Sequence, residues 1–567
     1  MIDLVLKGGT LVDGTGAPRY VADVAINGGR IVGVGKIADT AKRTIDATGL
    51  TVAPGFIDIH THYDAQVLWD GTCSPSPLHG VTSVVAGNCG FTLAPAGPEH
   101  ADYLTRLLAR VEGIELSVLQ RAIDWTWKST SDYFGLFEES LAINAGFYTG
   151  HSALRRQVMG ERAVGNYATD DEIAAMKALL RESIAAGSLG FSSSNAGTHN
   201  DGDGAPVPSR STNELELLGL CEVLSEFPGT TLEYIPFRAA DEMSRMTAMA
   251  VTAQRNMNWN ILYVTADRPH VYNADLAVSD NAARYGATIR ALTLPGTLDT
   301  RINLTTSFML DSLPGWAPVV RAPIEERKRL LADAKVRQAL REGAIQAGPR
   351  RKELTDWSTY EICETFSPAL DGLAGHLIRD IAAMRPDLGP GGDSFDVLMD
   401  LVLADDLRTI LLPRSVGMDE ESWQHRGDVL RDPRVLVGAS DAGAHLDMIT
   451  TFSLPTTVLS RWVRERQVFS LEEGVHQLSG RIADFLGLVD RGRIAEGAIA
   501  DIVVFDADEV APGPVTMRND LPAGGSRLYG GAVGVEHVFV AGTEIVTGTE
   551  FTGSAPGEVL KSGKATR

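Results

Sequence analysis

The chain is poor in the features that mark secreted and membrane-spanning proteins. Four cysteines among 567 residues are too few for a disulfide framework, so we expect free thiols and a reducing, cytoplasmic location. No uninterrupted apolar run is long enough to cross a bilayer. The first residues, from Met1 to Lys7, have neither the basic region nor the long apolar core of a signal peptide. We therefore expect no signal peptide and no membrane partner.

Basic side chains are also scarce relative to acidic ones. The 51 lysines and arginines face 73 aspartates and glutamates, which gives a net charge of −22. Such a charge keeps a protein soluble and argues against a general affinity for nucleic acid. We expect no nucleic-acid partner, and a homo-oligomer stays open.

The two ends of the chain share one sequence pattern, and the middle of the chain has another. Residues 1–53 alternate short β-rich runs with turns, among them Asn27-Gly28, which is a strong hairpin signal. Residues 490–567 repeat this pattern. The sequence therefore predicts one small, sandwich-like β-domain that is discontinuous, because it is built from residues 1–53 and 490–567.

Residues 54–489 alternate strand-like with helix-like runs, the pattern of a parallel (β/α)8 TIM barrel. A capping box from Thr169 to Glu172 marks the start of one of its helices. Residues from about 299 to 431 exceed an ordinary connection, so we predict a lid-like insertion between the seventh and eighth strands. The candidate barrel strands are residues 52–59, 81–88, 144–149, 189–194, 230–236, 259–265, 287–294 and 435–440.

Two histidines one residue apart, His60 and His62, follow the first of these strands. Residues i and i+2 of an extended strand point to the same face, so both imidazoles can reach one point at the mouth of a barrel. A divalent metal needs this geometry. The alternative is a pair of polar loop histidines that share no ligand, and the spacing alone leaves both interpretations open.

The residues around this pair resemble the amidohydrolase superfamily. Residues 54–62, Pro-Gly-Phe-Ile-Asp-Ile-His-Thr-His, resemble its first barrel strand, which carries the first two metal ligands. Residues 491–506 resemble the turn that leads from the barrel back to the β-domain. Residues 87–95, which begin Gly-Asn-Cys-Gly and end Ala-Pro, are similar to the D-aminoacylase branch, the N-acyl-D-amino-acid deacylases. The resemblance implies a hydrolase that acts on carbon–nitrogen bonds other than peptide bonds.

The resemblance also implies roles for Cys89 and Asp441, which follow the second and the last strand. Cys89 would be a metal ligand, and its thiolate would favour zinc; the alternative is a small buried hydrophobe. Asp441 would bind metal and act as the catalytic group that takes a proton from the attacking water and returns it to the leaving amine. The alternative for Asp441 is a helix cap.

Further candidates lie beside the strand ends. His151, after the third strand, could polarise the scissile carbonyl as a catalytic residue or brace its loop. Arg155 could bind a substrate carboxylate through paired hydrogen bonds or pair with a local acid. The other candidate substrate-binding residues are Arg210, Arg268, His445 and Tyr263.

The sequence departs from this branch at its fifth and sixth strands. Residues 232–236 and 261–267 contain neither the histidines nor the lysine that the branch carries there. We therefore predict one metal ion per chain, zinc or another divalent metal, held by His60, His62, Cys89 and Asp441. The usual anchor for a substrate carboxylate is in doubt, and the roles of His199 and His270, in nearby loops, are open.

These features predict a metal-dependent amidohydrolase whose partner is a small amide. It would cleave the amide C–N bond of an N-acyl-(D-)amino acid, or a related amide, by metal-activated water. One alternative is a cyclic amide or ester hydrolase with the same machinery. Another is a non-catalytic binding protein on an inherited fold, because a fold does not fix a function.

Overall fold

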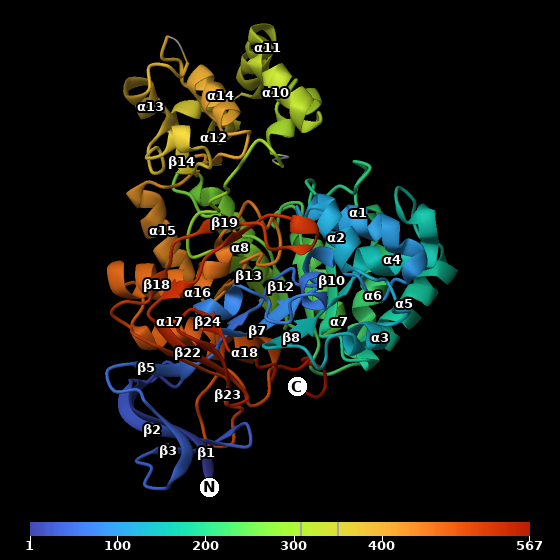
Figure 1. Ribbon diagram of the computed structural model, residues 1–567. Helices are drawn as coiled ribbons and strands as arrows, with labels where there is room; N and C mark the ends of the chain where they lie inside the picture. Colours follow the sequence, from blue (N-terminus) through green and yellow to red (C-terminus); the bar gives the residue numbers. More distant parts are fainter. Residues whose placement is uncertain (307–308, 349–350, 390) are drawn as a thin grey trace. The chain divides into compact units, whose positions relative to one another are not determined.

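The computed structural model describes residues 1–306, 309–348, 351–389 and 391–567 (Figure 1). Contacts among these described residues divide the chain into two compact units. The first comprises Met1–Gly296, Asp419–Leu446 and Thr451–Arg567, and the second comprises Thr297–Met418 and Asp447–Thr450. Within the same described ranges, no helix is both long and apolar enough to cross a membrane.

Both ends of the chain contribute strands to one mixed β-sheet in the first unit. Val52 of the N-terminal part pairs antiparallel with Val504 of the C-terminal part. Leu6, Val24 and Phe539 are buried in the same apolar cluster as this pair. In chain order the strands are β1 (Ile2–Leu11), β2 (Tyr20–Asn27), β3 (Arg30–Gly35), β4 (Ala41–Asp46), β5 (Thr51–Pro54), β17 (Ile502–Phe505), β22 (Val535–Val540), β23 (Thr543–Thr547) and β24 (Glu550–Phe551).

A second set of strands pairs in parallel, in the order of the chain. One group runs β6-β7-β8 and the other runs β9-β10-β11-β12-β13-β16, with only Tyr148 between β8 and β9. An isolated parallel bridge joins Thr61 to Ala442, just beyond the ends of β6 and β16. These strands are β6 (Phe56–Asp58), β7 (Val81–Ala86), β8 (Asn144–Phe147), β9 (Thr149–Gly150), β10 (Gly190–Ser194), β11 (Thr231–Ile235), β12 (Met257–Trp259), β13 (Ile289–Thr293) and β16 (Val435–Val437).

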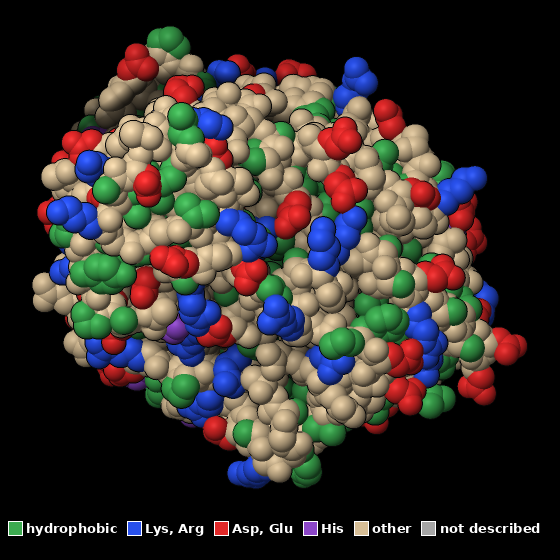
Figure 2. All heavy atoms as spheres, turned by 90° about the horizontal axis from the view of Figure 1, so that it is seen from below, with side chains coloured by type: hydrophobic (Ala, Val, Ile, Leu, Met, Phe, Trp, Pro, Cys, Tyr) green, Lys and Arg blue, Asp and Glu red, His purple; other side chains and the backbone are tan. Residues whose placement is uncertain are grey.

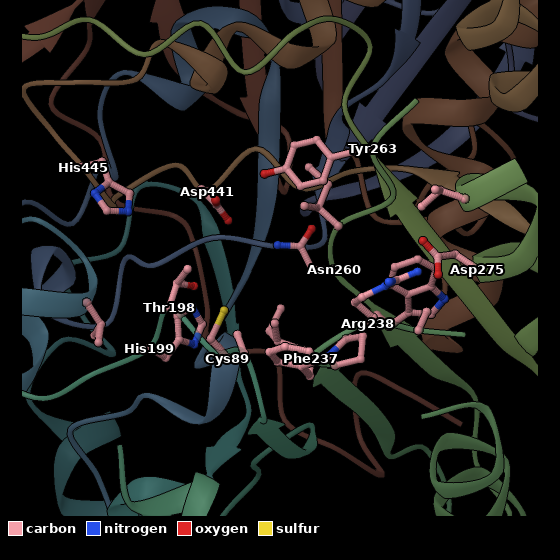
Figure 3. A pocket seen from close by; sticks show the side chains of 18 of the residues that line it. Cys89, Thr198, His199, Phe237, Arg238, Asn260, Tyr263, Asp275, Asp441 and His445 are labelled. Carbon is pink, nitrogen blue, oxygen red and sulfur yellow. The ribbon is translucent and has the colours of Figure 1, made fainter. Parts of the chain in front are cut away.

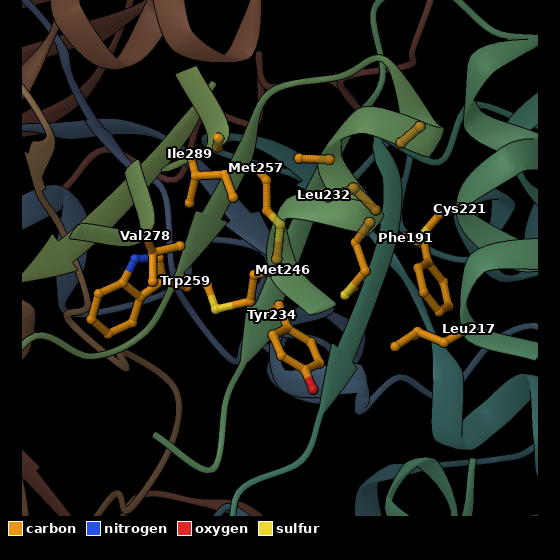
Figure 4. Packing of buried hydrophobic residues seen from close by; sticks show 14 of the residues in the cluster. Phe191, Leu217, Cys221, Leu232, Tyr234, Met246, Met257, Trp259, Val278 and Ile289 are labelled. Carbon is orange, nitrogen blue, oxygen red and sulfur yellow. The ribbon is translucent and has the colours of Figure 1, made fainter. Parts of the chain in front are cut away.

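Helices α5 (Asp170–Ala185), α6 (Glu214–Ser225), α7 (Met243–Ala253) and α8 (Pro269–Ala283) alternate with these strands. The capping box predicted at the start of α5 is confirmed, because Thr169 and Glu172 exchange their hydrogen bonds. The apolar faces of the helices meet those of the strands in one cluster (Figure 4). Its labelled members are Phe191, Leu217, Cys221, Leu232, Tyr234, Met246, Met257, Trp259, Val278 and Ile289.

The sixth strand, predicted at residues 259–265, begins and ends earlier in the structure. Strand β12 spans Met257–Trp259 and pairs with β11 and β13. Several residues that follow it, including Asn260 and Tyr263, line a cavity. The apolar pattern of this segment therefore reflects a cavity wall as well as a strand.

The second unit contains helices α10 (Ile324–Ala332), α11 (Ala334–Ala347), α13 (Ile378–Met384) and α14 (Ser394–Ala404). In its core Trp316 stacks on Trp357, with ring centroids 5.3 Å apart. The longer segment of this unit ends at Met418, whereas the predicted insertion extended to residue 431. The difference is helix α15 (Glu420–Arg431), which belongs to the first unit because its Trp423 packs on Trp462. The lid role of the insertion stays a prediction.

Charged side chains of both signs are interspersed on the face of the protein drawn in Figure 2. That distribution accords with a chain in which acidic residues outnumber basic ones by a moderate margin. The homo-oligomer stays a prediction.

Candidate metal centre

Three buried side chains converge where the parallel strands end. His60 and His62 follow β6, and Cys89 follows β7. One ligand atom from each lies within 4.8 Å of the others. Sγ of Cys89 is 3.6 Å from Nε2 of His60 and 3.7 Å from Nε2 of His62. The structure thus brings together the two histidines and the cysteine that the sequence singled out.

Asp441 joins this group from the segment after β16. Its Oδ1 lies 3.2 Å from Nε2 of His60 and 3.7 Å from Nε2 of His62. Within the described chain this buried oxygen has no hydrogen-bond partner. An unmet buried acceptor costs about 1–3 kcal/mol, which a cation at this point would remove. Two imidazole nitrogens, one thiol and one carboxylate form a donor set that fits zinc.

Two further carboxylates face the far side of these ligands. Oε1 of Glu112, at the end of α1 (Ala101–Val111), lies 3.2 Å from Nδ1 of His62. Oε2 of Glu233, on β11, accepts a hydrogen bond from the backbone N–H of Cys89 at 2.8 Å. Neither acid was predicted from the sequence to take part in the site.

The carboxylates differ in how readily they hold a proton. Burial raises the pKa of Glu112 to about 7 and that of Glu233 to about 8. Burial acts in the same direction on Asp441, but the imidazoles of His60 and His62 outweigh it and hold the pKa of Asp441 below its ordinary value. Asp441 is therefore the most acidic of these three carboxylates.

The loop that carries Cys89 has an unusual backbone. Cys89 has φ +59°, and Gly87 and Gly90 on either side have φ +77° and +74°. A left-handed conformation costs a residue other than glycine on the order of 1 kcal/mol or more and needs support from its surroundings. A Cβ at Gly87 would lie 2.6 Å from the carbonyl oxygen of Tyr148, so glycine is required there. The left-handed conformation of Cys89 helps to direct its thiol toward His60 and His62.

A cavity of about 430 Å³ opens onto these ligands. Trp259 lines it, and its indole N–H has no hydrogen-bond partner among the described residues. Figure 3 shows Cys89, His199, Asp441 and His445 toward one end, Arg238 and Asp275 toward the other, and Asn260 and Tyr263 between them. The cavity therefore has a metal-binding end and a charged end.

Three of the predicted substrate-binding residues line this cavity: Arg268, Tyr263 and His445. The backbone N–H of His445 donates to the carbonyl oxygen of Glu112 at 2.5 Å. His199 also lines the cavity, with Nδ1 2.7 Å from Oγ of Ser194. His270 is not among the described residues that line it.

His151 and Arg155 contact a buried acid, Glu216, which accords with the structural alternative given for each. Nε2 of His151 lies 2.8 Å from Oε1 of Glu216, and Nη1 of Arg155 donates to the same oxygen at 2.6 Å. All three side chains are buried, and none is among the described residues that line the cavity. Helix α4 (His151–Met159) begins directly after β9, so these side chains pack against α6 instead of facing the cavity.

Arg210 is likewise engaged elsewhere. Its Nη1 donates to the carbonyl oxygen of His199 and to Oδ1 of Asn200, each at 3.1 Å. It is not among the described residues that line the cavity, and its position is that of a brace for the loop around His199.

Known proteins resemble this chain over almost its whole length. A model of the amidohydrolase family matches residues 43–342 and 400–546. A D-aminoacylase of Alcaligenes xylosoxydans xylosoxydans is 29% identical, over 98% of this chain and 97% of its own. An N-acyl-D-aspartate deacylase of the same organism is also 29% identical, over 99% and 96%. A solved D-aminoacylase, described as having a binuclear metal centre with one-metal activation and second-metal attenuation, is 25% identical, with a TM-score of 0.65 and coverage of 99% and 100%.

Proposed function

The chain belongs to the amidohydrolase family, and we propose that it hydrolyses the amide C–N bond of N-acyl-D-amino acids or closely related small amides. The family membership confirms the resemblance predicted from the sequence. The substrate class is supported by the two deacylase relatives, which match from end to end. The observation that carries the proposal is the position of Oδ1 of Asp441, 3.2 Å from Nε2 of His60 and 3.7 Å from Nε2 of His62, beside the cluster that these histidines form with Cys89 at the end of the cavity.

For the fold, the proposal is a closed (β/α)8 barrel with the discontinuous β-domain beside it. Parallel pairing in chain order supports it, because each βα repeat of such a barrel adds the next strand. The bridge between Thr61 and Ala442 supports closure, since it links the first strand of the series to the last.

For the metal, the proposal is about one zinc ion per chain, held by His60, His62, Cys89 and Asp441. When bound, zinc supplies Lewis-acid polarisation of the scissile carbonyl and activates water for attack. Among the described residues, the cluster of potential ligands is His60, His62 and Cys89, with Asp441 beside it. Asn260 stands next to this cluster, with its amide nitrogen 3.3 Å from Nε2 of His60.

Asp441 is the proposed general base and then general acid. Its carboxylate is ionised, lines the cavity and lies at the ligand cluster. From there it can take a proton from the attacking water and return it to the leaving amine. The neighbouring carboxylates lie on the far side of the ligands, where Glu112 contacts Nδ1 of His62 and Glu233 accepts the backbone N–H of Cys89.

The charged end of the cavity is the proposed site for the substrate carboxylate. Arg238 lies at this end and Arg268 lines the same cavity. The ion pairs of these arginines are long, at 3.7 Å from Arg238 to Asp241 and 3.4 Å from Arg268 to Asp267. Both guanidinium groups are more than half exposed, so they can form paired hydrogen bonds with a carboxylate. The unpartnered indole N–H of Trp259 offers a further donor.

The test is hydrolysis of matched N-acetyl-D- and N-acetyl-L-amino acids by protein loaded with zinc and by protein treated with a chelator. We expect zinc-dependent release of the D-amino acid. Release from cyclic amides or esters alone would replace this substrate class with another. Zinc-loaded protein that hydrolyses none of these compounds would overturn the proposal in favour of a binding protein.

A further inference from the structure

We propose that Glu112 and Glu233 are positioning residues of the metal site: Glu112 fixes the imidazole of His62, and Glu233 fixes the thiol of Cys89 and faces the imidazole of His60. The inference rests on the proposed function, because it concerns the same site. Neither carboxylate is a ligand in this proposal; each acts through a ligand that it touches.

Glu112 determines which nitrogen of His62 is available to a metal. Its Oε1 lies 3.2 Å from Nδ1 of His62, and both side chains are buried. A carboxylate at that distance keeps the ring proton on Nδ1, which leaves the lone pair of Nε2 free. Nε2 is the nitrogen that faces Sγ of Cys89 and Oδ1 of Asp441, each at 3.7 Å. The carboxylate also makes the imidazole a stronger donor to a cation.

Glu112 also links His62 to the other wall of the cavity. Its backbone carbonyl accepts the N–H of His445, which lines the same cavity. Its position at the end of α1 therefore couples two residues of the site through one amino acid. A residue that only filled space in the core would need neither contact.

Glu233 determines the position of the thiol through the backbone. Its Oε2 accepts the N–H of Cys89 at 2.8 Å, and Cys89 is the residue held at φ +59°. The other oxygen, Oε1, lies 3.9 Å from Nδ1 of His60, and neither atom has a hydrogen-bond partner in the described part of the chain. One buried carboxylate thus contacts the main chain of one ligand and faces the ring of another. In its ionised form this carboxylate would also stabilise a cation held by those ligands.

The experiment measures the zinc dissociation constant by competition with a chromophoric chelator. The variants are Glu112→Gln and Glu233→Gln, which keep side-chain size and remove charge, together with Glu112→Ala and Glu233→Ala. The control is Glu242→Gln, since Glu242 is also buried and accepts a hydrogen bond, from Tyr234, but touches no ligand. We expect zinc affinity to fall about 10–100-fold in the alanine variants, and less in the glutamine variants, whose amide oxygen can still accept. The control should match the wild type.

A spectroscopic readout separates positioning from simple loss of structure. In the cobalt-substituted protein, Glu233→Gln should alter the thiolate-to-cobalt absorption, whereas Glu112→Gln should change mainly the ligand-field bands. Melting temperatures of the metal-free proteins identify any variant that fails to fold, and the glutamine variants remain informative if an alanine variant does. Affinities within twofold of the wild type, with unchanged cobalt spectra, would overturn the inference. A wild type that binds zinc tightly but hydrolyses no N-acyl-D-amino acid would overturn the proposed function alone, and one that binds no metal would overturn both.

Discussion

Oδ1 of Asp441 lies 3.2 Å from Nε2 of His60. Asp441 follows β16, the last strand of the parallel series, whereas His60 follows β6, which is the first. The ligand set is therefore complete only when the two ends of the strand series meet. A metal bound there ties the ends together, which links metal occupancy to the stability of the fold.

Removal of the metal should lower stability. A ligand that binds only the folded state at 1,000 times its dissociation constant adds about 4 kcal/mol. We expect chelator-treated protein to unfold at a lower temperature than zinc-loaded protein, as measured by calorimetry. A His60→Asn variant serves as the control, because it should lose most of the response to zinc. Equal unfolding temperatures with and without zinc would contradict the linkage.

Replacement of Cys89 by serine should weaken metal retention, because a serine hydroxyl is a poorer zinc ligand at neutral pH than a thiolate. Elemental analysis after dialysis should give about one zinc per wild-type chain, as proposed above, and clearly less for Cys89→Ser. Cys221→Ser is the matched control, since Cys221 is buried in the apolar cluster of Figure 4. Full zinc content in the Cys89 variant would make this cysteine structural.

Replacement of Asp441 by asparagine should abolish most of the turnover at saturating zinc. An amide cannot take the proton, and general acid–base assistance typically contributes at least ~100-fold. The loss should fall on kcat more than on KM, because proton transfer belongs to the transition state. Steady-state kinetics with an N-acetyl-D-amino acid measures both constants. A near-normal kcat would remove Asp441 from the catalytic steps.

Truncation of Arg238 or Arg268 to alanine should raise KM for N-acyl-D-amino acids, because both side chains line the cavity. The corresponding α-amides, which have no carboxylate to bind, should be hydrolysed poorly by the wild type and change little in the variants. Arg210→Ala is the control, since Arg210 is bonded to its own loop. Equal kcat/KM for acid and amide in every variant would exclude a carboxylate clamp.

Acid should destabilise the protein through His79, which is buried between Oγ1 of Thr456 and the carbonyl oxygen of Gly530. Burial lowers the pKa of His79 to about 4 from an ordinary value of 6.5. The unfolded chain therefore takes up this proton first, and stability falls as the pH drops from 6.5 to about 4. The full effect is about 3 kcal/mol. Urea unfolding at pH 7 and 4.5 should show a smaller loss in His79→Gln than in the wild type.

The sequence was most informative where chemistry and strand position coincide. His60 and His62 could be placed at one point because side chains repeat every two residues along a strand, and Cys89 and Asp441 follow strands of the same parallel series. Glu233 also left a signal, since it is an acid inside an apolar strand. Glu112 left none: its side chain meets His62 only through the packing of α1, which no local pattern encodes.

His151 and Arg155 show the limit of arguments from position alone. Both follow the third predicted strand, as expected of residues at the mouth of a barrel. Helix α4 begins at His151, however, and both side chains contact Glu216. A charged residue after a strand is therefore ambiguous until its partner is known. Arg238 is the converse case, because it lines the cavity although no sequence pattern predicted it there.

The pairing of β5 with β17 has a consequence for folding during synthesis on the ribosome. Val52 can pair with Val504 only after about 450 further residues have been synthesised. At a synthesis rate of about 5–20 residues per second, that wait is roughly 20–90 s on the ribosome. During it, one edge of the N-terminal strands has no partner and is open to wrong pairing. Chaperone dependence during translation, measured as the yield of active enzyme, should therefore include a contribution from this junction.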